Sequence, residues 1–401
     1  MGEDGVLAEY LLQFAKTTNK NKQGAGIMEK KIISRRIERL KGKMYETKLD
    51  TIMIFSNENR RYLSGYTGED SSFDETAGIL IITEEHNILV TDARYDVQAK
   101  NEAGELYFIN CYTGKLADEL TDILKAANSN KVGIEASRLP YSEYIGLTEN
   151  ISKKNYDIKF SDVSEILCSL RINKDENEIN KIKAALKIAE AAFMEFRQKI
   201  KPGMTEKESA WLLEKLMREK GAESLSFPVI AAAGKNSALP HAIPGNKKFK
   251  PGEPLLFDFG ARLDGYCSDT TRTLVMGKPD EKFKTIYEIL FNAQQLAVDK
   301  IKPGIIAKDI DKTARDYIDA TKFKGKFTHS LGHGVGLVIH EAPRLSKKDD
   351  TILEPGMVIT VEPGIYLPEW GGIRLENMVM VTDNGACVLN TMDYKDYIIY
   401  V

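Results

Sequence analysis

The stretch PLLFDFGARLDGYCSDTTRTLVM, residues 254–276, predicts more about the fold than any other part of the chain. Its Asp264-Gly265 dipeptide lies between two apolar runs, which is typical of a two-residue β-hairpin turn. Counting back from that turn, Asp258 pairs with Thr271 across two antiparallel strands. The stretch therefore predicts a hairpin with a defined register.

Two aspartates of this hairpin share one face. In the predicted register Asp269 is the diagonal neighbour of Asp258, and diagonal neighbours are roughly 7–8 Å apart. Two carboxylates at that spacing repel each other unless cations lie between them. An ordinary solvated face is the alternative, but the flanking Leu255, Leu256 and Phe257 disfavour it. We interpret the two aspartates as candidate metal ligands.

A second pair of carboxylates lies in GMVITVEPGIYLPEWGGIRLENMVMV, residues 356–381. Glu362 ends an apolar strand just before Pro363, and Glu376 is expected inside the next strand. A carboxylate inside an apolar strand needs a partner. Because Arg374 shares the face of Glu376, an ion pair between them would explain Glu376, but it would leave Glu362 unexplained.

Four of the five histidines fall within one hundred residues, which favours a metal or catalytic site over isolated core histidines. They are His241, His329, His333 and His340. The last three lie in THSLGHGVGLVIHEAP, residues 328–343, where glycines oppose a helix and so exclude an HExxH zinc site. Within this segment GLVIH is expected to form a strand that ends at His340, although a flexible glycine loop explains the segment equally well.

Together these segments supply four carboxylates and one to several imidazoles. Four negative charges match two divalent cations, and an oxygen-rich donor set suits Mn²⁺ best, with Co²⁺ and Zn²⁺ as alternatives. Two such ions can bridge a water and lower its pKa towards neutrality, which gives a hydroxide nucleophile for a carbonyl. A covalent nucleophile is then unnecessary, and the sequence contains no GxSxG, P-loop or strand-associated GxGxxG motif.

Composition limits the classes of function. A chain of 401 residues predicts two domains, and a formal charge of −3 provides no broad cationic surface for nucleic acid or membrane lipid. No apolar run approaches the length of a membrane-spanning helix, and the N-terminus lacks the pattern of a secretory signal. The four cysteines have no CxxC spacing, which opposes a disulfide framework and fits a cytoplasmic location.

The chain divides into three predicted parts. Residues 1–27 have a linker composition and are expected to be a flexible extension, with a regulatory tail as the alternative. Residues 28–164 alternate strands and helices and predict a small α/β domain, followed by a second domain over residues 165–401. In that domain KIKPG occurs twice at an offset of 101 residues, in matching helix-turn-helix context, which favours a duplicated half-domain with a site between the halves.

Four motifs in this order resemble the pita-bread metallopeptidases: SALPHA, DFGARLDGYCSDTTRT, HSLGHGVGLVIHEAPRL and VITVEPGIYLPEWGGIRLEN. The resemblance is closest to the proline-specific branch, the Xaa-Pro aminopeptidases and Xaa-Pro dipeptidases (prolidases). NRRYLSGYTG and TDARYDVQA resemble the creatinase-type N-terminal domain of the same enzymes. The resemblance implies an α/β (α+β) fold, with a small N-terminal α/β domain, a pita-bread domain with a pseudo-two-fold repeat, and assembly as a homodimer.

The resemblance also implies a set of metal ligands. Asp258 resembles the bidentate ligand of one metal, and Asp269 and Glu376 resemble the bridging carboxylates. His333 and Glu362 resemble ligands of the other metal, and Glu362 also resembles the carboxylate that shuttles a proton. None of the five ligand positions departs from the family pattern.

Four further residues match active-site positions of the family. His241, His340 and Arg374 match catalytic positions that support the ligands or bind substrate, and His329 matches a further histidine that contacts substrate. His340 is expected to help stabilise the tetrahedral intermediate, and Arg374 to hold a substrate carboxylate or carbonyl.

We expect an Xaa-Pro aminopeptidase that acts on short proline-containing peptides, with an Xaa-Pro dipeptidase as the alternative. Arg374 suits both and does not separate them. A metal-free creatinase-type hydrolase and a non-enzymatic pita-bread interaction protein are more distant alternatives, and the complete ligand set opposes both. The additional N-terminal domain disfavours a methionine aminopeptidase.

Overall fold

The computed structural model describes residues 25–70, 72, 75–394 and 396–400, and it divides the chain into two compact units, Met1–Leu170 and Arg171–Val401. The sequence predicted a division after residue 164, at the start of α7 (Ser164–Arg171). The two units of the structure divide between Leu170 and Arg171, at the end of the same helix. The predicted extension lies outside the described residues up to residue 24, and helix α2 (Ala25–Thr47) already includes its last three residues.

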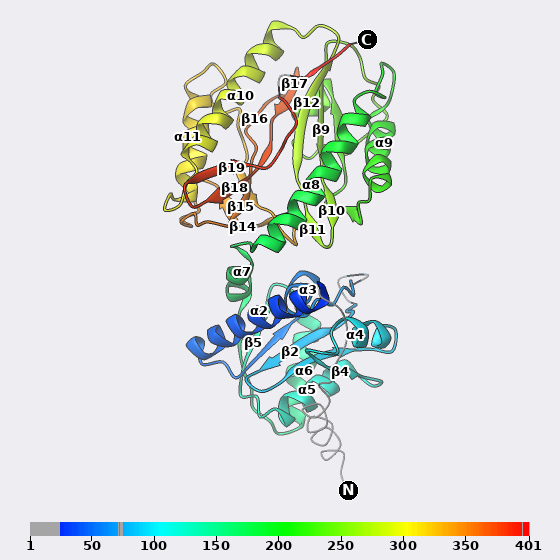
Figure 1. Cartoon of the computed structure of the whole chain (residues 1–401), viewed down its shortest axis with the longest axis vertical. Coiled ribbons are helices and arrows are strands. Elements are labelled where there is room, and N and C mark those ends of the chain that lie inside the picture. The colour runs from blue at the N-terminus through cyan, green and yellow to red at the C-terminus, as the bar shows by residue number, and fades with distance from the viewer. Residues whose placement is uncertain (1–24, 71, 73–74, 395, 401) are drawn as a thin grey trace. The chain divides into compact units, whose positions relative to one another are not determined.

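The first unit is built on a six-stranded mixed sheet in the order β4-β3-β2-β1-β5-β6 (Figure 1). Its strands are β1 (Thr51–Ile54), β2 (Ile79–Thr83), β3 (Asn87–Thr91), β4 (Phe108–Cys111), β5 (Lys131–Ile134) and β6 (Lys159–Asp162). Its other helices are α3 (Asn57–Ser64), α4 (Asp96–Glu102), α5 (Leu116–Ala126) and α6 (Tyr141–Lys153). The predicted alternation of strands and helices in a small α/β domain is confirmed.

The central strands β1 and β2 of this sheet are mostly apolar and buried because both of their faces are covered. Met53 and Ile81 pack with Leu120 of α5 and Leu147 of α6 in one core. Alternate residues such as Ile52 point to the opposite face, and they are fully buried as well.

The first half of the second unit contains the predicted hairpin. A four-stranded sheet joins β8 (Ile230–Ala233), β9 (Pro254–Phe259), β12 (Thr270–Met276) and β20 (Ile398–Ile399), and a smaller one joins β7 (Ser224–Leu225), β10 (Ala261–Leu263) and β11 (Tyr266–Cys267). Helices α8 (Glu176–Phe196) and α9 (Glu206–Glu219) bury their apolar stripes against these strands. Asp258 pairs with Thr271 as predicted, and the turn residues Asp264 and Gly265 have φ of 48° and 79°, as a type I′ turn requires.

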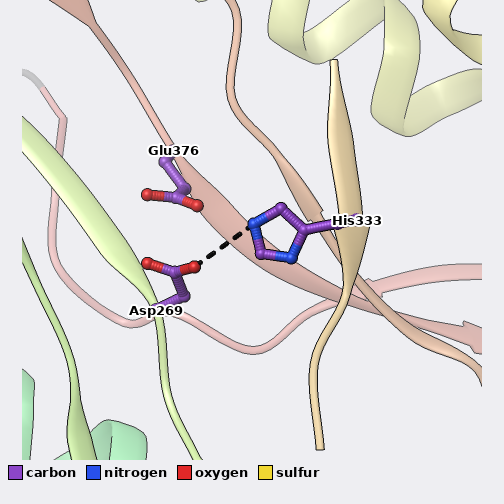
Figure 2. Close-up of side chains that lie close together, drawn as sticks. All are labelled: Asp269, His333 and Glu376. Atoms are coloured by element: carbon purple, nitrogen blue, oxygen red, sulfur yellow. Dashed lines mark ion pairs between the residues drawn. The ribbon is translucent and has the colours of Figure 1, made fainter. Parts of the chain in front are cut away.

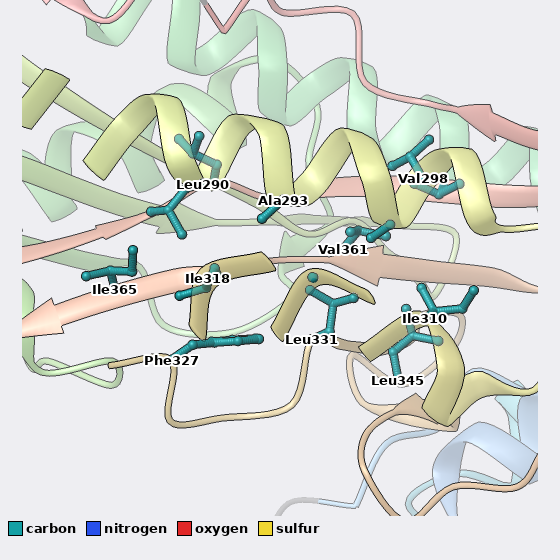
Figure 3. Packing of buried hydrophobic residues seen from close by; sticks show 14 of the residues in the cluster. Leu290, Ala293, Val298, Ile310, Ile318, Phe327, Leu331, Leu345, Val361 and Ile365 are labelled. Carbon is teal, nitrogen blue, oxygen red and sulfur yellow. The ribbon is translucent and has the colours of Figure 1, made fainter. Parts of the chain in front are cut away.

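The second half repeats this plan. Its five-stranded sheet joins β14 (Glu341–Leu345), β13 (Gly332–Gly334), β15 (Val358–Val361), β18 (Asn377–Thr382) and β19 (Gly385–Val388), and β16 (Gly364–Leu367) pairs with β17 (Gly371–Arg374). Helices α10 (Glu281–Lys300) and α11 (Ala307–Asp319) cover it. Figure 3 shows Leu290 and Ala293 of α10 and Ile310 and Ile318 of α11 packed in one core with the sheet.

The sequence repeat corresponds to a structural one. Helix α9 begins at Glu206 and α11 begins at Ala307, the same offset of 101 residues. Gly203 and Gly304 precede them with φ of 83° and 85°, and their N–H groups donate to the carbonyls of Phe249 and Leu353, respectively. The predicted pseudo-two-fold repeat is confirmed. None of the described helices combines the length and apolar character needed to cross a membrane.

Two local predictions were wrong. Residues 336–340 form a series of bends, and the strand begins only at Glu341, because Gly336 donates its N–H to the carbonyl of Val338 and accepts from Cys267. Glu376 is not inside a strand but in a two-residue break between β17 and β18, where its N–H donates to the carbonyl of Thr271.

Candidate metal centre

Three buried side chains from separate elements converge on one point. Asp269 immediately precedes β12, His333 lies on β13, and Glu376 lies between β17 and β18. One ligand atom from each lies within 4.8 Å of the others (Figure 2). The sheets of the two halves therefore meet where the duplicated sequence predicted a site.

His333 presents a lone pair to the carboxylates. Its Nδ1 is 3.1 Å from the carbonyl oxygen of Gly334, which can only accept, so this nitrogen carries the proton of a neutral ring. Burial, followed by the charge of His340, lowers the pKa of His333 to about 3 and keeps the ring neutral. The unprotonated Nε2 then faces Oδ2 of Asp269 at 3.5 Å and Oε1 of Glu362 at 3.4 Å. Three lone pairs that face one another are stable only with a cation or an added proton between them.

The carboxylates show the same need for a cation. Burial raises the pKa of Glu362 to about 8. Burial first, and then the charges of the neighbouring carboxylates, raises the pKa of Asp269 and of Glu376 well above the ordinary values. Oδ1 of Asp258 is buried and has no hydrogen-bond partner among the described residues. Oxygen donors in this number, with one imidazole nitrogen, fit divalent cations of the Mn²⁺ type.

Arg374 pairs with Asp258 and not with Glu376, the ion pair that was the alternative explanation for Glu376. Its guanidinium donates to Oδ2 of Asp258 at 2.6 Å and to the hydroxyl of Thr271 at 3.0 Å. The Thr271 hydroxyl in turn donates to Oε2 of Glu376 at 2.7 Å. The ion pair of Arg374 therefore secures one oxygen of Asp258, whereas Glu376 is held through a threonine. The break before β18 gives Glu376 this position.

His329 is held by two hydrogen bonds beside this cluster. Its Nδ1 lies 2.7 Å from the carbonyl oxygen of Ser330, so Nδ1 carries the proton, and Nε2 accepts from the hydroxyl of Tyr366 at 2.8 Å. Arg374 donates to the same hydroxyl at 3.0 Å. Burial, followed by the charge of Arg374, lowers the pKa of His329 to about 3. His329 is therefore a neutral imidazole that carries its proton on Nδ1.

Comparison with known proteins identifies the family to which the chain belongs. Residues 180–383 match the metallopeptidase family M24, and residues 36–172 match the creatinase/prolidase N-terminal domain. The chain belongs to the metallopeptidase family M24. The predicted family resemblance and the assignment as a peptidase are confirmed.

Three similar proteins cover nearly the whole chain. The Xaa-Pro dipeptidase of Pyrococcus furiosus is 40% identical over 351 residues, 88% of this chain and 96% of that protein. The structure of the Xaa-Pro dipeptidase from Bacillus anthracis matches with a TM-score of 0.85 at 39% identity, over 92% of this chain and 100% of that chain. The structure of the X-Pro aminopeptidase from Thermotoga maritima MSB8 matches with a TM-score of 0.79 at 36% identity, over 88% of this chain and 98% of that chain.

The other two candidate histidines of this M24 peptidase, His340 and His241, lie at the rim of the site. The ring of His340 meets that of His333 edge-on, with centroids 4.3 Å apart. His241 is exposed, and its charge contributes to lowering the pKa of both His329 and His340 after the larger effect of burial. The structure thus gathers the carboxylates, Arg374, His329 and His333, whereas His340 and His241 are exposed.

Buried Glu206 holds the loop that carries His241. Its carboxylate accepts from the N–H groups of Ala233 and Gly245, both at 2.9 Å, and from the amide of Asn236 at 3.0 Å. The two ends of the loop are therefore fixed to the first turn of α9.

Sequence reasoning missed Thr271 and Tyr366 as parts of this site. Thr271 was identified only as the strand partner of Asp258, and Tyr366 lay in a quoted motif without a role. For Tyr366 the available signal was a hydroxyl in the otherwise apolar strand GIYL, because a buried hydroxyl needs a partner. For Thr271 the neighbouring Thr270, Arg272 and Thr273 hid that signal.

Proposed function

We propose that this M24 peptidase is an Xaa-Pro dipeptidase, a prolidase that hydrolyses the bond before proline in Xaa-Pro dipeptides. The supporting observation is the 40% identity to the Pyrococcus furiosus Xaa-Pro dipeptidase over 96% of that protein. The similarity to the Bacillus anthracis Xaa-Pro dipeptidase agrees with it. The aminopeptidase expected from the sequence has less specific support, and the dipeptidase alternative fits better.

We further propose that five residues hold two divalent ions, with Mn²⁺ preferred over Co²⁺ and Zn²⁺. They are Asp258, Asp269, His333, Glu362 and Glu376. The neutral Nε2 of His333 and the orphaned Oδ1 of Asp258 support this assignment. When bound, such a metal pair supplies Lewis-acid polarisation of a carbonyl and an activated water.

The chain's own side chains supply proton transfer and substrate binding. Glu362 transfers a proton to the proline nitrogen, because an amide anion is a very poor leaving group. His340 stabilises charge on the carbonyl oxygen as it becomes tetrahedral, and His241 and His329 bind the substrate. Arg374 directs its remaining hydrogen-bonding capacity to a substrate carboxylate or carbonyl.

The assembly and location belong to the same proposal. A homodimer that works in the cytoplasm fits the family resemblance, and a closed two-fold dimer is the commonest oligomer. Light scattering should then give about twice the 45.0 kDa of one chain. A monomeric mass at full activity would remove the dimer from the mechanism.

Substrate length tests the dipeptidase directly. The Mn²⁺-loaded protein should hydrolyse Xaa-Pro dipeptides and reject Xaa-Pro-Yaa tripeptides that carry the same first residue. Equal or faster hydrolysis of the tripeptides would return the assignment to an aminopeptidase. Hydrolysis of neither series would reject Xaa-Pro specificity altogether.

A further inference from the structure

Gln294 is a fully buried amide on the apolar face of α10. Its exposed fraction is 0%, and Leu290, Ala293 and Ala297 on the same face belong to the hydrophobic core. Figure 3 shows this helix lying along the strand that carries Val361. Burying an amide costs free energy unless it forms hydrogen bonds. The NH2 group of Gln294 forms them, whereas its Oε1 has no hydrogen-bond partner among the described residues.

Both of its N–H groups are used on the backbone next to candidate metal ligands. The side-chain amide donates to the carbonyl oxygen of Val361 at 2.7 Å and to that of Leu375 at 3.1 Å. These carbonyls belong to the peptide groups that lead into Glu362 and Glu376. One side chain therefore joins the two segments from which both glutamates project.

The bridge lies where strand pairing changes. Val361 pairs with Asn377 in the β15–β18 ladder, and Gly364 pairs with Arg374 in the β16–β17 ladder. The residues between them, including both glutamates, belong to neither ladder. Between the two ladders the segments share one backbone hydrogen bond, from the N–H of Leu375 to the carbonyl of Pro363 at 3.3 Å, and the Gln294 amide adds a second connection there.

The other side of each peptide group is also bonded. The N–H of Glu362 donates to the carbonyl of Leu331 at 2.7 Å, and the N–H of Glu376 donates to that of Thr271 at 3.3 Å. With Gln294 on the carbonyl side, each peptide plane is held from both sides. Without Gln294, the carbonyls of Val361 and Leu375 lose this shared donor, and the N–H bonds and the pairing of Val361 with Asn377 remain.

We propose that Gln294 is a positioning residue that fixes the separation and orientation of Glu362 and Glu376, and so sets the affinity of the site for its divalent ions. The inference rests on the metal site of the proposed function and does not depend on its substrate. Partners outside the ligand set typically change metal affinity 10–100-fold when they are removed. Gln294 is placed to act on two ligands at once.

Gln294→Met tests this role, with Gln295→Met as the matched control. Methionine has nearly the same volume and donates no hydrogen bond. Mn²⁺ affinity is measured by calorimetry on metal-stripped protein, and Tm is measured with and without Mn²⁺. The expected result is a roughly 10–100-fold weaker Kd for Gln294→Met and a smaller rise of Tm on adding Mn²⁺. Gln295→Met, the same change one residue along the helix, should match the wild type in both.

A purely structural role gives a different pattern. It would lower Tm equally with and without Mn²⁺ and leave Kd unchanged, and that result would overturn the proposal. If Gln294→Met does not fold, Gln294→Asn keeps the amide but cannot reach both carbonyls, and the same two measurements apply to it. Neither readout uses a peptide, so failure on Xaa-Pro substrates leaves the inference intact. A wild-type protein that binds no Mn²⁺, Co²⁺ or Zn²⁺ would reject it.

Discussion

At the scale of single residues, Asp269 is the most constrained of the candidate ligands. It is almost fully buried, and Glu376, Asp258 and Glu362 all repel its negative charge. A carboxylate in that position is stable as an anion only beside a cation, and its placement is explained by the metal it would hold.

Asp269→Asn should release metal and lower kcat by roughly 100-fold or more, because metal catalysis contributes several kcal/mol and each 1.36 kcal/mol is tenfold. Metal content is measured by elemental analysis and rate on an Xaa-Pro dipeptide. Asp264→Asn is the control in the same hairpin, since asparagine tolerates the φ of 48° at that turn position. Unchanged metal content in Asp269→Asn would contradict its role as a ligand.

At the scale of elements, α11 contrasts a buried and an exposed ion pair of the same spacing. Arg315 binds Asp311 with N–O distances of 2.7 and 2.8 Å, and it also donates to the carbonyls of Phe327 and His329. Asp311 accepts from the N–H of Leu331. The helix thereby holds the segment that leads into His333. One residue further along, Lys312 and Asp316 pair in solvent.

Arg315→Met should lower the free energy of unfolding by about 3–5 kcal/mol, because it leaves the buried Asp311 carboxylate without its partner. Lys312→Met should lower the free energy of unfolding by less than about 0.5 kcal/mol, which is the usual contribution of an exposed ion pair on a helix. Urea denaturation of the metal-loaded protein measures both. Similar losses for the two variants would mean that burial of the Arg315 pair adds nothing to stability.

At the scale of the whole molecule, the stability of the second unit depends on charges gathered between its two halves. Burial raises the pKa of Glu362 from 4.5 to about 8 and lowers the pKa of His329 and His333 from 6.5 to about 3. With rising pH the raised carboxyl destabilises the metal-free protein between 4.5 and 8, because the folded state binds the extra proton. The two histidines have the opposite effect. Between pH 3 and 6.5 they stabilise the folded protein as pH rises, because the unfolded state binds more protons there.

Only the carboxyl effect remains between pH 6.5 and 8. The metal-free protein should therefore lose thermal stability as pH rises through this interval, whereas Mn²⁺-loaded protein, with its carboxylates ionised throughout, should not share that loss. Calorimetric Tm values of chelator-treated and Mn²⁺-loaded samples at both pH values test this. A Tm difference that stays constant from pH 6.5 to 8 would contradict the electrostatic account of the site.

The sequence by itself determined the features that depend on neighbouring residues. Asp264-Gly265 selects the turn, and a two-residue turn fixes the pairing of Asp258 with Thr271. Thr205 and Glu208, three positions apart in the sequence, form a capping box at the start of α9. Local geometry suffices for each of these features, and the repeated motif KIKPG identified the two halves because each copy builds the same turn.

Only the tertiary structure decided which groups meet across the halves. The glycines near His333 opposed a helix, but what they pack against became known only from the fold: a Cβ at Gly332 would lie 1.9 Å from the carbonyl oxygen of Thr360. Likewise Arg374 pairs with Asp258, 116 residues away, rather than with Glu376, two residues away. The physical reason is that strand alternation places Arg374 and Glu376 on one face only while the ladder continues, and here the ladder stops at Arg374.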